Sequence, residues 1–165
     1  MYREKIKELE MWKNSSDRKP LIIRGARQVG KTWLMQEFGK KNYEKVAYIN
    51  FDGNERMERL FQGDFNIERL IEGLKIETGV NIEKENTLLI FDEVQEVPKA
   101  LTSLKYFYEN ANEYNVIAAG SLLRCSFTWR YIISCWKSWF YGFISTKFQR
   151  IPYSNRRRKI IKIDW

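Results

Sequence analysis

Short apolar runs alternate with amphipathic helical patterns along the first 121 residues. The apolar runs predict strands over residues 21–24, 45–52, 86–93 and 114–121. Apolar side chains spaced three or four residues apart predict helices over residues 3–13, 31–41, 54–78 and 98–112. Strands that alternate with helices in this way favour a parallel sheet covered on both faces. We therefore expect an α/β fold with three layers, α/β/α, and a mostly parallel sheet.

The loop after the first predicted strand carries the clearest chemical motif. Residues 25–32 read GARQVGKT and match the pattern G-x-x-x-x-G-K-[ST] at each fixed position, between a predicted strand and a predicted helix. The glycines let the backbone curl so that successive N–H groups face phosphate oxygens, and the helix adds the positive end of its dipole. We expect Lys31 to reach the β- and γ-phosphates and Thr32 to ligate Mg²⁺.

The predicted phosphate-binding residues form one continuous run. They are Gly25, Ala26, Arg27, Gln28, Val29, Gly30, Lys31, Thr32 and Trp33. Arg27 lies inside the loop, where contact with phosphate and a surface role are equally compatible with the sequence. The motif alone thus predicts a nucleotide site of the P-loop class, without a specific role for every member of the run.

A pair of carboxylates follows the third predicted strand. The strand reads LLIF, and Asp92 and Glu93 come directly after it, about 60 residues beyond the phosphate loop. A phosphate-bound Mg²⁺ needs a carboxylate at the end of a neighbouring strand, and Asp92 fits that role. Glu93 is placed to orient and deprotonate an attacking water. Ser121 ends the fourth predicted strand. Its hydroxyl could hydrogen-bond the attacking water or the γ-phosphate, or the residue could belong to an ordinary turn at the end of the strand.

Four stretches together resemble a known family. They are KPLIIRGARQVGKTWL, YINFD, LLIFDEVQEVP and VIAAGSLL, in that order within roughly residues 15–123. In this order and spacing the chain resembles the AAA+-related P-loop ATPases of bacteria and archaea. In that family the ATPase module is followed by a C-terminal domain of poorly known function, and the intact proteins can form homo-oligomers.

The resemblance implies an activity and a role for each motif. It implies Mg²⁺ and ATP as the bound species, with ATP hydrolysis as the reaction. Lys31 and Thr32 would be Walker A residues, Asp92 and Glu93 Walker B residues, and Ser121 would hold the sensor-1 position. Other P-loop classes fit less well, because the N-K-x-D motif of GTPases does not occur and small-molecule kinases usually lack the Asp–Glu pair.

The chain changes character after residue 123. Its net charge of +8 falls wholly on residues 125–165, because residues 1–124 carry equal numbers of basic and acidic side chains. Both cysteines and four of the six tryptophans also lie beyond residue 124. We expect three segments: an N-terminal helix and lead-in over 1–19, a P-loop ATPase core over 20–123, and an aberrant basic and aromatic tail over 124–165. The +8 charge thus says little about the core.

We hypothesise that a shift of reading frame near residues 123–130 produced the tail. The resemblance calls for Ser-Phe-Pro-Val-Gly-Lys-Val after GSLL, and the genetic code allows that run if residues 132–139 are read one base later. The hypothesis is that the tail is a non-native frame or disordered, so that the core is truncated and its fifth strand is missing. Residues 21–24 would then form an edge of the sheet, and hydrolysis would be impaired. The coding DNA tests this.

Composition adds a few limits. Histidine is absent, which excludes histidine-based acid–base catalysis. Cys125 and Cys135 are too few for a disulfide framework, which favours a reducing, cytoplasmic setting. The alternative function uses the tail: its aromatic and basic side chains, with RRRK at 156–159, could bind a membrane surface or nucleic acid. The leading expectation is ATP binding, without a membrane or nucleic-acid partner.

Overall fold

A parallel sheet forms the centre of the protein. The computed structural model describes residues 2–25, 28–121 and 143–145. Its strands are β1 (Leu21–Gly25), β2 (Lys45–Asn50), β3 (Thr87–Asp92), β4 (Asn115–Ser121) and β5 (Phe143–Ser145). They lie in the order β2-β3-β4-β1-β5, and each neighbouring pair is parallel. The predicted α/β fold with its parallel sheet is confirmed.

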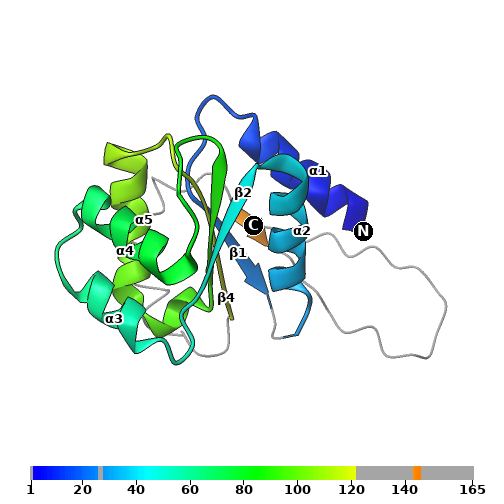
Figure 1. Ribbon diagram of the computed structural model, residues 1–165. Helices are drawn as coiled ribbons and strands as arrows, with labels where there is room; N and C mark the ends of the chain where they lie inside the picture. The colour runs from blue at the N-terminus through cyan, green and yellow to red at the C-terminus, as the bar shows by residue number, and fades with distance from the viewer. Residues whose placement is uncertain (1, 26–27, 122–142, 146–165) are drawn as a thin grey trace.

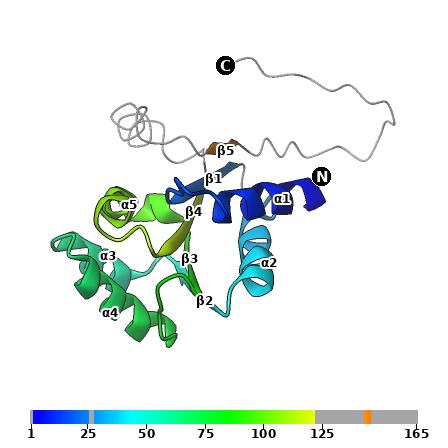
Figure 2. The same cartoon turned by 90° about the horizontal axis from the view of Figure 1, so that it is seen from above.

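Helices cover both faces of the sheet. One face carries α1 (Tyr2–Lys13) and α2 (Lys31–Asn42), and the other carries α3 (Glu55–Gln62), α4 (Ile67–Thr78) and α5 (Pro98–Asn110) (Figures 1 and 2). A short 3-10 helix, η1 (Val94–Glu96), follows β3. The molecule therefore has the three layers that the alternation of strands and helices predicts.

Strand β3 is buried along its whole length, and its alternating side chains build both halves of the core. All six of its residues are buried. Leu88 and Ile90 pack with the α1 and α2 face, whereas Leu89 and Phe91 pack with the α3, α4 and α5 face. Asp92 has the same parity as Leu88 and Ile90, so the last residue of the strand lies on the face of α2.

The predicted helix over residues 54–78 is in fact two helices. Asn66 breaks the pattern, because its side chain accepts a hydrogen bond from the backbone N–H of Arg69 at 3.0 Å and so caps a new helix. Asn54 caps α3 in the same way, through the N–H of Met57 at 3.1 Å. The apolar spacing continues across both helices because both pack on the same face of the sheet, which is why the sequence resembles one long helix.

The expectation that residues 21–24 form an edge of the sheet needs correction. Ile22, Ile23 and Arg24 of β1 pair with β5, Phe143–Ser145. An uncovered β1 would leave a row of backbone N–H and C=O groups unpaired, and a short extended segment satisfies part of that row. A short fifth strand is therefore present. Apart from β5, the predicted tail from residue 124 lies outside the described residues.

Close packing between α2 and the sheet leads to a first testable prediction. A Cβ atom on Gly39 would lie 2.7 Å from Val46 Cγ2 and 3.1 Å from Leu88 Cδ2. We expect Gly39→Ala to lower the free energy of unfolding by about 1 kcal/mol, because overpacking outweighs the better helix propensity of alanine. Urea denaturation followed by circular dichroism measures this change. Lys40→Ala, at the exposed neighbouring position, is the control, and equal stability gains in both variants would contradict the prediction.

Candidate functional site

The predicted phosphate loop joins the carboxyl end of β1 to the start of α2. Gly30 caps that helix with φ 85°, a left-handed conformation that favours glycine. Lys31 is the first helical residue and is 6 % exposed, and its Nζ donates to the carbonyl oxygen of Gly25 at 3.3 Å. The lysine therefore folds back over the loop that the sequence assigns to phosphate. Ala26 and Arg27 lie outside the described residues.

Thr32 and Asp92, the two predicted metal ligands, are in direct contact. Asp92 is 3 % exposed at the end of β3, and Thr32 Oγ1 donates to its Oδ2 at 2.5 Å. The backbone N–H of Glu93 donates to the other oxygen, Oδ1, at 3.0 Å. Residues 60 positions apart thus place a hydroxyl and a buried carboxylate together at the carboxyl end of the sheet, and oxygen atoms of this kind are the ligands that Mg²⁺ prefers.

Glu93 leaves the strand in an unusual conformation. Its φ is 50° and its ψ is 38°, so the chain turns sharply after Asp92 and the predicted strand ends one residue earlier than expected. The Gln95 side-chain amide donates to Glu93 Oε2 and, at 3.3 Å, to Glu96 Oε1. A non-glycine residue in the left-handed region is held there by its surroundings, which is common at functional sites.

The other predicted residues that the structure describes lie on the phosphate loop, at the start of α2 and at the end of β4. Ser121 pairs in register with Gly25, so the backbone at the end of β4 lies beside the start of the phosphate loop. Gln28 has φ 59° within the loop and is exposed, and Val29 is half-buried. The Trp33 side chain is 55 % exposed at the start of α2. Their roles toward a nucleotide stay predictions.

Tyr48 belongs to the site although the sequence does not single it out. It lies on β2, opposite Ile90 of β3, and its hydroxyl donates to Asp92 Oδ2 at 3.1 Å. Burial, then the charge and hydrogen bond of Asp92, raises the pKa of Tyr48 to about 12. The hydroxyl thus keeps its proton throughout the neutral range and stays a hydrogen-bond donor. The stretch YINFD contains the residue, but only the register of β2 on β3 brings it to Asp92.

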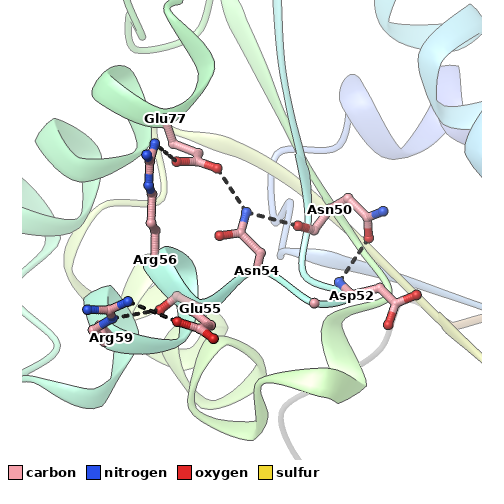
Figure 3. Close-up of a pocket in the computed structure, with 8 residues that line it drawn as sticks. Asn50, Asp52, Asn54, Glu55, Arg56, Arg59 and Glu77 are labelled. Atoms are coloured by element: carbon pink, nitrogen blue, oxygen red, sulfur yellow. Dashed lines mark hydrogen bonds and ion pairs between the residues drawn. The ribbon is translucent and has the colours of Figure 1, made fainter.

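A polar pocket of about 590 Å³ lies next to this centre, at the end of β2 (Figure 3). Its lining comes from Asn50 at the end of β2, the β2–α3 loop, α3 and Glu77 of α4, and includes none of the predicted phosphate-binding residues. Asn54 Nδ2 donates to Glu77 Oε1 at 2.8 Å, and Arg59 pairs with Glu55 at 3.0 Å (Figure 3). The pocket is a shallow depression open to solvent, and several of the polar side chains that line it pair with one another.

Two kinds of feature are absent from the described residues. Nowhere in residues 2–25, 28–121 and 143–145 do three or more Asp, Glu or Cys side chains gather in a way that could hold a metal. The same part of the chain has no helix long and apolar enough to cross a membrane.

Comparisons with known proteins give a family match and two similar folds. Residues 17–127 match the family model described as an AAA domain. C. elegans PCH-2 is similar in structure, with 15% identity and a TM-score of 0.40 over 76% of this chain and 35% of that one. AMPPCP-bound DnaA from Aquifex aeolicus has 23% identity and a TM-score of 0.42, over 72% and 36%. The chain spans about a third of either protein. No curated protein matches the sequence.

Proposed function

The chain belongs to the AAA domain family, and from this premise we propose that residues 25–32 bind ATP together with Mg²⁺. The observation that supports this most strongly is the contact of Thr32 Oγ1 with Asp92 Oδ2 at 2.5 Å. It joins the two motifs that the sequence assigns separately to phosphate and to metal. Nucleotide binding is the general property of the fold, and ATP with Mg²⁺ is the specific form that we propose.

The residues present fit a magnesium nucleotide. Thr32 and Asp92 offer hard oxygen atoms, and Asp92 is buried, so its charge acts in a medium of low dielectric constant. One carboxylate and one hydroxyl leave room for phosphate oxygens and water, which is how proteins usually hold Mg²⁺. When bound, the metal would neutralise phosphate charge and polarise the γ-phosphoryl group. Lys31, on the first turn of α2, would add a positive charge to the same group.

Hydrolysis is the second step of the proposal. Glu93 would orient a water molecule and accept its proton, and the Ser121 hydroxyl would hydrogen-bond the water or the γ-phosphate. The turn at Glu93, with φ 50°, supports a role outside the strand itself. We propose slow turnover for the isolated chain, because the resemblance implies an arginine from a neighbouring subunit at the complete site.

Titration with a fluorescent ATP analogue tests nucleotide binding. In the presence of Mg²⁺ we expect saturable binding that unlabelled ATP displaces. The same titration in EDTA measures the contribution of the metal, and we expect weaker binding there. Binding that ATP does not displace, or no saturable binding at all, would overturn the proposal.

Glu93→Gln separates hydrolysis from binding. The amide keeps the size of the side chain but cannot accept the proton, so we expect steady-state hydrolysis to fall at least about 100-fold. ATP affinity should stay within about twofold, because the phosphates are held by other residues. Phosphate release from the wild-type and variant proteins, measured at the same ATP saturation, checks this. An unchanged rate would show that another group activates the water.

A further inference from the structure

Two side chains hold the same oxygen of Asp92. Thr32 Oγ1 and Tyr48 OH both donate to Oδ2, at 2.5 and 3.1 Å. An ionised carboxylate oxygen offers about two lone pairs, so these donors satisfy Oδ2. Within the described residues, Oδ1 accepts from the N–H of Glu93 and keeps a further lone pair. The carboxylate is thus fixed in one rotation before any ligand arrives.

The proposed function gives the two donors on Oδ2 different roles. Thr32 is itself a proposed metal ligand, and its hydroxyl can rotate about the Cβ–Oγ1 bond when its lone pairs turn to a metal. Tyr48 has no such second task. Its ring packs against the α1 and α2 side of the core, and this packing holds the hydroxyl in place beside Asp92.

The strand register explains why a tyrosine is suited to this position. Tyr48 is paired with Ile90, and Asp92 is two residues further along β3 on the same face. With neighbouring strands about 4.8 Å apart and a rise of about 3.3 Å per residue, such diagonal neighbours are about 8 Å apart, a gap that only a long side chain spans. A phenol reaches across it and delivers a hydroxyl, whereas a serine or threonine at the same place would fall short.

From this geometry we propose that Tyr48 is a positioning residue, which holds the Asp92 carboxylate in the orientation that takes up Mg²⁺ with the nucleotide. The inference rests on the proposed function and names a residue outside its motifs. Groups that orient a metal ligand in this way typically change metal affinity 10–100-fold when removed. The hydroxyl acts through Asp92 and has no contact with the nucleotide in this assignment.

Tyr48→Phe tests the proposal, because it removes the hydroxyl and keeps the ring. Binding of a fluorescent ATP analogue is measured over a series of Mg²⁺ concentrations and in EDTA. We expect the Mg²⁺ concentration for half-maximal enhancement to rise about tenfold or more, with affinity in EDTA changed less than about twofold. This readout concerns binding and does not depend on turnover.

Tyr43→Phe is the matched control. Its hydroxyl also makes a single side-chain hydrogen bond, to Asn115 Oδ1 at 3.0 Å, but at the start of β4, the opposite end of the sheet from Asp92. We expect it to leave both affinities unchanged. An unaltered Mg²⁺ dependence in Tyr48→Phe would overturn the inference alone, as would an equal loss of affinity with and without metal. Failure of the wild-type protein to bind would overturn the proposed function and this inference with it.

Discussion

Replacing Lys31 with alanine should raise the dissociation constant for MgATP at least about 100-fold. The side chain is buried over the phosphate loop, with its ammonium at the Gly25 carbonyl, where a phosphate would be held. Hydrogen bonds to charged groups contribute about 1.5–3 kcal/mol each, and Lys31 can make two to the β- and γ-phosphates. A loss of about 3 kcal/mol corresponds to this factor in affinity.

The fold itself should tolerate this change. The Lys31 ammonium donates to the Gly25 carbonyl at the longer end of the hydrogen-bond range, 3.3 Å, and alanine favours the helix that begins there. We expect the free energy of unfolding to stay within about 1 kcal/mol of the wild-type value. Lys40→Ala, on an exposed turn of the same helix, should bind nucleotide normally. If Lys31→Ala bound MgATP as tightly as the wild type, the assignment of the loop would be wrong.

Phe91→Ala should lower the free energy of unfolding by about 4 kcal/mol. Phe91 is 0% exposed, and its ring meets Phe51, Phe61 and Phe107 edge-on, with centroids 5.4, 5.9 and 6.2 Å away. Removing the ring loses its burial and these contacts and leaves a cavity, which costs about 3–5 kcal/mol. Domains are stable by about 5–15 kcal/mol in total, so the loss is a large share. Urea denaturation followed by circular dichroism measures it.

Two further variants make this result interpretable. Phe65→Ala removes a half-buried ring that stacks on Tyr106 at 4.5 Å, and we expect a cost of about 1–2 kcal/mol. Phe91→Leu keeps most of the volume and should cost about 1–2 kcal/mol, which keeps the test possible if the alanine variant does not fold. Equal losses for Phe65→Ala and Phe91→Ala would contradict the central position of Phe91.

The order of elements follows from the sequence because its signals are local. The apolar run before GARQVGKT has to be a buried strand, and the motif itself starts a helix, so β1 and α2 are fixed by neighbouring residues. The break at Asn66 is also local, but the continuous apolar face of 54–78 hides it. The order of the strands in the sheet, in contrast, depends on contacts between distant segments. Pairing of Phe143–Ser145 with β1 joins segments more than 100 residues apart, and no local pattern predicts it.

The residues of the candidate site likewise differ in whether local sequence predicts them. Residues within one motif, such as Lys31 and Thr32, are predictable because their spacing is set by one loop and one helix. The contact of Thr32 with Asp92 is predictable in outline, since parallel strands end at one edge of the sheet. The contact of Tyr48 with Asp92 is not predictable, because it depends on which strand pairs with β3 and in which register. A single-residue slip would turn Tyr48 to the other face and away from Asp92.

Asp92 and its donor Tyr48 lie on strands of unequal local stability. Asp92 ends β3, which lies between two partner strands. Tyr48 lies on β2, which is at the end of the sheet and pairs only with β3 among the described strands. Edge strands open by local fluctuation at lower free energy than the core, which amide hydrogen exchange detects. Opening of β2 alone would withdraw Tyr48 while Thr32, Lys31 and the loop stay in place. Metal retention and nucleotide retention could therefore be lost at different denaturant concentrations, with the metal released first.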